Sequence, residues 1–401
     1  MTQLWHECLS AEVLMEGRRC KNTGLPQDDT TVPFFDRLIR VVLTTQGGCF
    51  RIEKPVSYST EKIPVDKNIF DKLFEKKALT EEESYSVFGE IMDEKVSPVQ
   101  AAAFLALLKM KGEQPTEIAG AAKLLRDKAV RVEAARGKTV CDTCGTGGDN
   151  SGTFNISTCT AILGFACGLT VAKHGNRSVT SRCGSADVLE SVGYRIDLEP
   201  SKSEDLLNNY GFAFLFAPLY HRAMKNVMAV RKELGFRTIF NIIGPLCNPA
   251  HSGVQIMGVS DYNLLKIIPP VFQSMGIEGY VFHSEDGLDE ISLTARTYIA
   301  EVSGRSIKEF EIYPQDFGFK KCSLSDLKGG DVKTNAGIMT DIIAGKEKGA
   351  MRDIVLLNTA FLLKAAGAAS DIKKGLSIAA GALEKQACGT KFKKLLDAVN
   401  K

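Results

Sequence analysis

The sequence predicts an α/β protein with a small N-terminal helical domain and a larger domain built on a central, mostly parallel sheet. Two observations support this prediction. From residue 68 to 136 the apolar residues follow helical spacing, whereas after Gly137 short apolar strands that end in glycine-rich turns alternate with helices. Such alternation is typical of a sheet covered by helices. A chain of 401 residues is long enough for two or more domains.

Four short helices are expected in the first domain, which we place at residues 66–136. The second of them begins with Thr80 and Glu83, which have the spacing of a capping box. The third begins at Ser97, where a serine followed by proline is a typical helix start. Helices from about 219–240 are expected to join this domain.

The larger domain is placed at residues 137–401, and each of its expected strands is a short apolar segment followed by a turn. The expected strands are 139–144, 169–172, 213–216, 254–259, 279–283 and 309–313. The expected helices include 157–167 and, in the Ala- and Leu-rich last third, 335–344, 350–366 and 372–388. Ligands of open α/β sheets gather outside the carboxyl ends of the strands, so functional residues are expected there.

Residues 1–65 carry no motif. We treat them as an N-terminal extension of unknown role, which leaves open an accessory segment, a frayed tail or a start codon placed too far upstream. Its first part, residues 1–24, has no sustained apolar segment, and Glu7, Glu12 and Glu16 argue against an organelle transit peptide.

Charge and cysteine usage limit the partners and the compartment. The 50 Lys and Arg against 48 Asp and Glu give a net charge of +2, which offers no electrostatic reason for a nucleic-acid or membrane partner. The 11 cysteines lack the spacing of a secreted scaffold, so reduced thiols and a cytoplasmic protein are expected. Cys141 and Cys144 have a zinc-like spacing, but no second pair follows, so buried structural thiols in a strand are expected.

The segment from Gly145 to Asp149, Gly-Thr-Gly-Gly-Asp, follows an expected strand. Three glycines within four residues let the backbone approach an anion closely. No Gly-Lys-Ser/Thr follows, as a Walker loop requires, and Asn150 stands where a dinucleotide fingerprint needs glycine. Thr153 to Thr158 come next, at a helix N-terminus, which favours phosphate. Together the two segments predict a phosphate site; a simple connecting turn is the alternative.

Two further clusters suit an anionic ligand. Lys173 to Arg177, Lys-His-Gly-Asn-Arg, follows the next expected strand, and hydroxyl residues up to Ser185 follow it, so a phosphorylated or carboxylated ligand is favoured over an exposed polar turn. Asp289 and Glu290 follow a later strand and are of a type that binds Mg²⁺ together with substrate oxygens. Taken alone, that pair would be read as solvated charge. Arg231 precedes a bulky, turn-forming segment at 237–249 that predicts a packed region near it.

In this order and spacing, the motifs resemble those of anthranilate phosphoribosyltransferases. The resemblance covers about residues 67–401 and leaves residues 1–65 unexplained. It implies a fold of the nucleoside phosphorylase/phosphoribosyltransferase type, usually dimeric through the helical parts. Cys144 and Cys183 stand where other small residues are expected. The motifs that carry the resemblance are Gly145–Asp149, Phe154–Thr158, Lys173–Arg177, Gly184–Glu190, Asn241–Pro249 and Asp289–Glu290.

The resemblance also implies roles for individual residues. Those that would hold phosphoribosyl pyrophosphate (PRPP) are Gly145, Gly147, Gly148, Asp149, Thr153, Asn155, Ser157, Thr158, Lys173 and Ser185. Those that would contact anthranilate are Gly145, His174, Asn176 and Arg231. Those that would bind two Mg²⁺ ions are Ser157, Asp289 and Glu290.

The implied reaction transfers the 5-phosphoribosyl group of PRPP to the amine of anthranilate, in tryptophan biosynthesis. The products are N-(5-phosphoribosyl)anthranilate and pyrophosphate. The ribose C1 would acquire oxocarbenium character, as in glycoside cleavage. An arginine can hold the carboxylate of anthranilate, and positioning of the weakly basic amine matters more than a strong base. No general base is assigned.

Other functions remain as alternatives. A pyrimidine nucleoside phosphorylase of the same fold would use phosphate as nucleophile, and would need neither the acidic pair nor Arg231. A non-catalytic relative that binds nucleic acid would show a basic surface and eroded motifs. Another phosphoribosyltransferase class carries an acidic pair before a Thr-Gly loop, and no such segment is found.

Overall fold

The computed structural model describes residues 62, 64–135, 137–178 and 182–401. These residues belong to one compact unit, Glu61–Lys401. The expected N-terminal extension lies outside the described residues except at its end, so the fold presented here is that of this unit.

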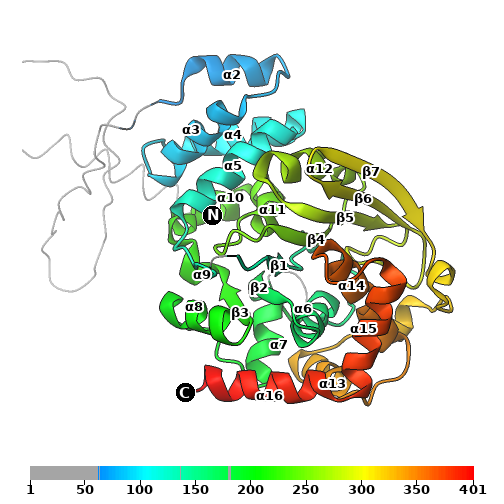
Figure 1. The fold of residues 1–401 in the computed structure, drawn as a ribbon. Helices are drawn as coiled ribbons and strands as arrows, with labels where there is room; N and C mark the ends of the chain where they lie inside the picture. The colour runs from blue at the N-terminus through cyan, green and yellow to red at the C-terminus, as the bar shows by residue number, and fades with distance from the viewer. Residues whose placement is uncertain (1–61, 63, 136, 179–181) are drawn as a thin grey trace, which may run out of the picture. The chain divides into compact units, whose positions relative to one another are not determined.

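The first helices form where the local signals predict them. They are α2 (Lys67–Phe74), α3 (Glu81–Met92), α4 (Pro98–Lys111) and α5 (Pro115–Lys128) (Figure 1). The capping box of α3 is confirmed: the amide of Glu83 donates to Thr80 Oγ1 at 3.2 Å, and the amide of Thr80 donates to Glu83 Oε2 at 2.9 Å. Ser97 caps α4 by accepting from the amide of Gln100 at 3.2 Å.

Helices from the middle of the chain pack with this group, namely α10 (Lys225–Leu234) and α11 (Phe240–Ile243). The short α9 (Ala217–Tyr220) instead contacts β3. α10 contacts α3 and α4. The ring of Phe88 meets Phe104 of α4 edge-on at 5.4 Å between centroids and Phe240 of α11 at 5.6 Å. Segments about 150 positions apart therefore share one aromatic cluster.

The larger domain contains a sheet with the strand order β3-β2-β1-β4-β5-β6-β7. The pairings from β3 to β5 are parallel, whereas β6 pairs antiparallel with β5 and β7, so the expected mostly parallel sheet is confirmed. The strands are β1 (Val140–Asp142), β2 (Thr170–Gly175), β3 (Phe212–Phe216), β4 (Val254–Gly258), β5 (Glu278–Ser284), β6 (Thr297–Ser303) and β7 (Ser306–Ile312).

The two faces of the sheet belong to different hydrophobic clusters. Ile256 and Phe282 pack with α6 (Ile156–Ala166) and the C-terminal helices, whereas their strand neighbours Met257 and Val281 pack with the N-terminal helices and α12 (Leu264–Met275). Alternate strand residues point to opposite faces, so one sheet separates the two helical layers (Figure 1). The remaining helices are α7 (Ser185–Ser191), α8 (Pro200–Asn209), α13 (Val332–Ile343), α14 (Ala350–Ala365), α15 (Ile372–Glu384) and α16 (Ala387–Val399).

Two sequence predictions need correction. β6 was not predicted, although it pairs along its whole length with both neighbours. The single helix expected at 372–388 is two helices, because Gln386 adopts a left-handed conformation (φ 53°) that ends one helix before the next begins.

No helix of the described residues is long and apolar enough to cross a membrane. The eight cysteines in this part of the chain form no disulfide with one another. Cys141 lies buried in β1 as expected, but Cys144 follows the strand and is only partly buried.

Candidate active site

The predicted site residues lie where the parallel strands end. The glycine loop follows β1, and the acidic pair follows β5. Lys173 and His174 were expected just after a strand, but they belong to β2 itself, which continues to Gly175. This longer strand explains why both side chains are buried, with 2% and 4% of their surface exposed.

The glycine loop is joined to the acidic pair by direct contacts. The amide of Gly147 donates to Asp289 Oδ2 at 2.8 Å, and the amide of Thr146 donates to the carbonyl of Gly258 at 2.9 Å. A Cβ on Gly145 would lie 2.9 Å from that carbonyl oxygen and 3.2 Å from Asp289 Oδ2. Glycine at position 145 is therefore required by close packing rather than by a turn alone.

The acidic pair sits where negative charge is unfavourable. Burial and, after it, the nearby Asp149 carboxylate together raise the pKa of Asp289 to about 7. Burial, followed by the charge of Asp289, raises the pKa of Glu290 well above its usual value, while the backbone of Ser157 opposes the shift by hydrogen bonding. These carboxylates fit a site that gains a cation.

That cation would need ligands beyond the protein. No three His, Cys, Asp or Glu side chains among the described residues are arranged to hold a metal ion by themselves. Mg²⁺ usually takes one or two carboxylates and completes its shell with water and substrate phosphates. The half-buried pair Asp289 and Glu290, with Ser157 beside it, fits such a partial ligand set.

Lys173 places a positive charge next to the start of α6. Its ammonium donates to Thr143 Oγ1 at 3.1 Å and to Ser157 Oγ at 3.4 Å. Thr143 in turn donates to the carbonyl of Ser157 at 2.8 Å. Lys173 forms no ion pair with any described residue. A buried cation that is satisfied only by hydroxyls is suited to an anionic ligand.

Asp142, which the sequence analysis did not single out, organises this region. Its Oδ1 accepts from the amides of Thr143 at 2.7 Å and His174 at 3.3 Å, and its Oδ2 accepts from Asn248 Nδ2 at 2.7 Å. Complete burial raises the pKa of Asp142 to about 6, and the charge of Lys173 opposes that shift. A carboxylate at the end of an otherwise apolar strand was the signal available in the sequence.

The start of α6 is fixed by side chains from other segments. Asn155 donates from Nδ2 to the carbonyl of Cys183 at 3.1 Å and accepts from Asn335 Nδ2 at 3.0 Å. Thr153 forms an isolated bridge with Lys328. Thr158 has no exposed surface and its hydroxyl has no hydrogen-bond partner among the residues that the structure describes, so a ligand could reach that side chain only if the first turn of α6 shifted.

Ser185 is brought to the end of β2 by the absence of a side chain at Gly175. A Cβ there would lie 2.3 Å from Ser185 Oγ, which donates to the carbonyl of the exposed Asn176 at 3.2 Å. Arg177, which the sequence suggested as a ligand-binding cation, pairs instead with Asp187 and Glu190, both at 2.8 Å.

The side chains expected to contact anthranilate interact with other residues rather than with one another. His174 lies 5.1 Å from His221 between ring centroids, and the backbone of Gly244 is near enough to hydrogen-bond its buried ring. Burial, and then His221, lowers the pKa of His174 well below its usual value, so the imidazole is neutral. Arg231 lies over the ring of Phe240 at 5.3 Å and forms no ion pair with any described residue.

Arg237 was not assigned to the site from the sequence, yet it is a further cation beside the glycine loop. Its guanidinium donates to the carbonyls of Gly147 at 3.2 Å and Gly148 at 3.3 Å, so it lies on the glycine loop. A Cβ on Gly148 would lie 2.2 Å from Arg237 Nη1. The exposed guanidinium brings positive charge to a loop that is suited to phosphate.

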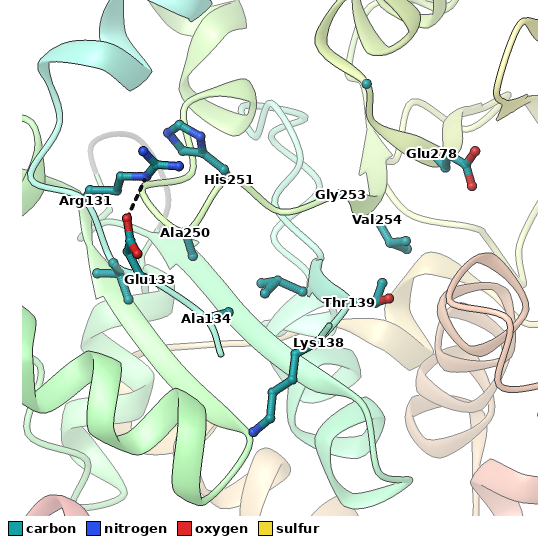
Figure 2. A pocket seen from close by; sticks show the side chains of 13 residues that line it. Arg131, Glu133, Ala134, Lys138, Thr139, Ala250, His251, Gly253, Val254 and Glu278 are labelled. Carbon is teal, nitrogen blue, oxygen red and sulfur yellow. Dashed lines mark ion pairs between the residues drawn. The ribbon is translucent and has the colours of Figure 1, made fainter. Parts of the chain in front are cut away.

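A hollow of about 500 Å³ lies away from these residues, at the amino ends of β1 and β4 (Figure 2). Arg131, Glu133, Lys138 and His251 are among its lining residues. Ligands of such sheets bind at the opposite, carboxyl edge, so we do not assign the reaction to this hollow.

Comparison with known proteins identifies relatives along most of the chain. The glycosyl transferase family matches through its a/b domain at residues 137–387 and its helical bundle domain at residues 67–129. The anthranilate phosphoribosyltransferase of Geotalea uraniireducens is 44% identical over 348 residues, which are 83% of this chain and 99% of that protein. That of Persephonella marina is 45% identical over 314 residues, which are 78% of this chain and 93% of that protein.

Solved structures of anthranilate phosphoribosyltransferases also superpose on most of this chain. The anthranilate phosphoribosyltransferase of Thermus thermophilus superposes with a TM-score of 0.79 at 36% identity, covering 83% of this chain and 99% of that one. The Saccharomyces cerevisiae enzyme in complex with PRPP and Mg superposes with a TM-score of 0.75 at 25% identity, covering 84% of this chain and 98% of that one.

Proposed function

The chain belongs to the anthranilate phosphoribosyltransferase family, and on that basis we propose that the residues at the carboxyl ends of β1, β2 and β5 carry out its reaction. The enzyme transfers the 5-phosphoribosyl group of PRPP to the amine of anthranilate and releases pyrophosphate, a step of tryptophan biosynthesis. The hydrogen bond from Gly147 to Asp289 is the observation that most supports the site, because it joins a phosphate-binding loop to a metal-binding pair.

PRPP is proposed to lie between the glycine loop and the start of α6. The loop supplies backbone N–H groups, and Lys173 supplies a buried positive charge beside Ser157. Preorganised donors stabilise charge that develops in a transition state, here on the departing pyrophosphate. The other residues proposed to contact PRPP are Asp149, Thr153, Asn155 and Ser185, together with Thr158, which the ligand would reach after a shift of the first turn of α6.

Magnesium is the proposed metal, and the yeast relative was solved with Mg and PRPP together. We propose two ions, one held by Asp289 and Glu290 and a second placed with the help of Ser157. When bound, the metal would neutralise charge on the pyrophosphate oxygens. The raised pKa values of Asp289 and Glu290 support this assignment, because a cation would relieve the repulsion between them.

Anthranilate is proposed to be held by Arg231, with Gly145, His174 and Asn176 close to it. Arg231 is suited to a carboxylate because its guanidinium has no competing ion pair among the described residues. The neutral His174 could accept a hydrogen bond but would add no charge. No group in this set has the position of a strong base, so we propose that the site orients the amine toward the ribose C1.

A homodimer is proposed through the helical domain, residues 66–136 with the helices near 219–240. Val99 and Met110 are 79% and 64% exposed on α4. They are eleven residues apart, about three turns, and therefore lie on one face with Ala103 and Ala106 between them. Such an apolar stripe is unusual on a solvent-exposed helix, and a second copy would cover it. The free cysteines support the cytoplasmic location that we also propose.

The decay of anthranilate fluorescence after mixing with PRPP and Mg²⁺ tests this function. We expect loss that depends on PRPP and stops in EDTA. If the folded protein left anthranilate fluorescence unchanged under all conditions but cleaved a pyrimidine nucleoside in phosphate, the proposed site would instead belong to a phosphorylase.

A further inference from the structure

Arg237 reaches the glycine loop from the connection between α10 and α11. Its neighbours Thr238 and Ile239 are buried, with 2% and 0% of their surface exposed. The amide of Thr238 also donates to Asn241 Oδ1 at 3.0 Å. The backbone from which the exposed arginine projects is therefore fixed by packing, and its side chain extends from this base to the loop.

The guanidinium of Arg237 holds two consecutive carbonyl groups of the loop. Its Nη2 donates to the carbonyl of Gly147 at 3.2 Å, and its Nη1 donates to that of Gly148 at 3.3 Å. Both glycines adopt positive φ angles, 62° and 76°, which glycine reaches without the steric cost of a side chain. Arg237 forms no ion pair with any described residue, so no carboxylate of this part of the chain competes for the guanidinium.

This contact determines the direction of two N–H groups. In a planar trans peptide, the C=O group of one residue and the N–H group of the next point in opposite directions. No described peptide bond is cis, so the N–H groups of Gly148 and Asp149 point away from the guanidinium. Neither amide donates to another described residue, and both are therefore available to a ligand.

The two preceding amides of the loop are already used within the protein. The amide of Thr146 donates to the carbonyl of Gly258, and that of Gly147 donates to Asp289. An anion could use them only by breaking these bonds. The amides that Arg237 orients carry no such cost, so they are the better donors for a phosphate group.

We propose that Arg237 is a positioning residue for the pyrophosphate group of PRPP, an inference that rests on the proposed function. By holding two loop carbonyls on its own side, it aims the N–H groups of Gly148 and Asp149 at phosphate oxygens. Without the guanidinium, either peptide can rotate and turn a carbonyl oxygen toward the anion, which would repel it. The role needs two donors in a fixed geometry, and a lysine ammonium is a point charge on a flexible stem.

The first measurement is the affinity of the full chain for pyrophosphate in Mg²⁺, by isothermal titration calorimetry, which requires no turnover. Arg237→Lys keeps the charge, whereas Arg237→Ala removes it. The matched control is Arg195→Ala, because Arg195 is also exposed but lies between α7 and α8, where it pairs with Asp197.

We expect affinity to fall about tenfold or more in both Arg237 variants, the loss of about one hydrogen bond to a charged group. The Arg195 variant should bind as the unaltered chain does. Normal affinity in Arg237→Lys would overturn the proposal, because charge alone would then suffice. Absence of pyrophosphate binding by the unaltered chain would overturn it as well.

The second measurement follows the amide of Gly148 by nuclear magnetic resonance. Glycine labelled with carbonyl ¹³C and amide ¹⁵N selects glycines that follow another glycine, which are Gly48, Gly148 and Gly330. At saturating pyrophosphate, the Gly148 signal should shift in the unaltered chain and in Arg195→Ala. The shift should be clearly smaller in both Arg237 variants, at concentrations raised to saturate them. A shift of equal size would overturn the proposal, because the amide would then meet the anion unaided.

Failure of the proposed function would give a different result. Loss of anthranilate fluorescence reports the whole reaction, whereas both measurements report pyrophosphate alone. An active chain in which Arg237→Lys binds pyrophosphate normally would overturn the role of Arg237 and leave the function standing. A chain that shows the expected dependence on Arg237 but consumes no anthranilate would support the role of Arg237 and overturn the proposed function.

Discussion

The amide of Gly147 and Oδ2 of Asp289 form a 2.8 Å hydrogen bond across 142 positions of sequence. It fixes the glycine loop against the acidic pair before any ligand arrives. The same carboxylate carries the raised pKa that we attribute to burial and to Asp149. In this geometry, the proposed pyrophosphate and metal subsites are one structural unit, so a change in either should affect both.

The double change Asp289→Ala/Glu290→Ala should lower kcat/KM by about 10²-fold or more. Two carboxylates that would hold the metal are removed, and loss of one preorganised electrostatic contact alone commonly costs that much. Initial rates measured across a Mg²⁺ series provide the measurement. Glu285→Gln is the control, because Glu285 lies on the same loop but is exposed and pairs with Arg296 at 3.0 Å. Equal activity of the double variant and the control would contradict the assignment.

Gly258→Ala should also raise the Mg²⁺ concentration needed for half-maximal rate, although residue 258 would touch neither substrate nor metal. A Cβ at this position would lie 1.7 Å from the backbone oxygen of Asp289, so the acidic loop must move. Gly253→Ala is the matched change before the same strand, where a Cβ meets nothing within 4 Å. Comparing the Mg²⁺ concentration for half-maximal rate in the two variants tests the idea. A normal value in Gly258→Ala would show that the loop position is unimportant.

Most helices and strands could be predicted from the sequence, because caps and apolar spacing depend on residues that are close together in the chain. The capping box of Thr80 and Glu83 formed as expected, since both bonds lie within one helical turn. β6 was missed because Thr297, Glu301 and Ser303 interrupt its apolar residues, so it lacks the continuous apolar run that marked the parallel strands.

The candidate site could be predicted only in part, because its motifs are local but the contacts between them are not. The glycine loop and the acidic pair could be identified as separate motifs, but their contact depends on β4 lying between β1 and β5. The roles of Asp142 and Asn248 could not be derived from spacing, because their bond joins residues 106 positions apart. Arg177 has the composition of a ligand residue, yet its ion pairs to Asp187 and Glu190 follow from the position of α7.

The buried Asp142 predicts a pH effect on stability. Its pKa is raised from 3.8 to about 6, so the folded state holds a proton that the unfolded state has released between these values. Stability from this group is therefore lost as pH rises from about 4 to 6. At about 1.4 kcal/mol per pKa unit, the unaltered chain should lose up to about 3 kcal/mol of unfolding free energy between pH 4 and 7, and Asp142→Asn should not show this loss. Urea unfolding of both proteins at pH 4 and pH 7 measures the difference. An equal change of unfolding free energy with pH in the two proteins would refute it.

Arg231→Ala should raise the KM for anthranilate about 10- to 100-fold and leave the KM for PRPP nearly unchanged. The estimate corresponds to about 1.5–3 kcal/mol for a hydrogen bond to a charged group. Its guanidinium has no ion pair to lose among the described residues, so the change should spare the fold. The neighbouring, exposed Lys232→Ala controls for charge on α10. Both constants come from steady-state rates, and an unaltered KM for anthranilate would remove Arg231 from the substrate site.

The apolar stripe on α4 predicts the assembly. Val99→Glu with Met110→Glu should convert the proposed dimer to a monomer, because two charges would be buried in an interface proposed to be apolar. Both side chains are mostly exposed in the single chain, so the change should not disturb its fold. Light scattering after size exclusion gives the mass, and Ile307→Glu on β7, 36% exposed, is the matched control elsewhere on the surface. A monomeric unaltered chain would exclude the proposed dimer. A dimer that survives the double change would place the contact elsewhere.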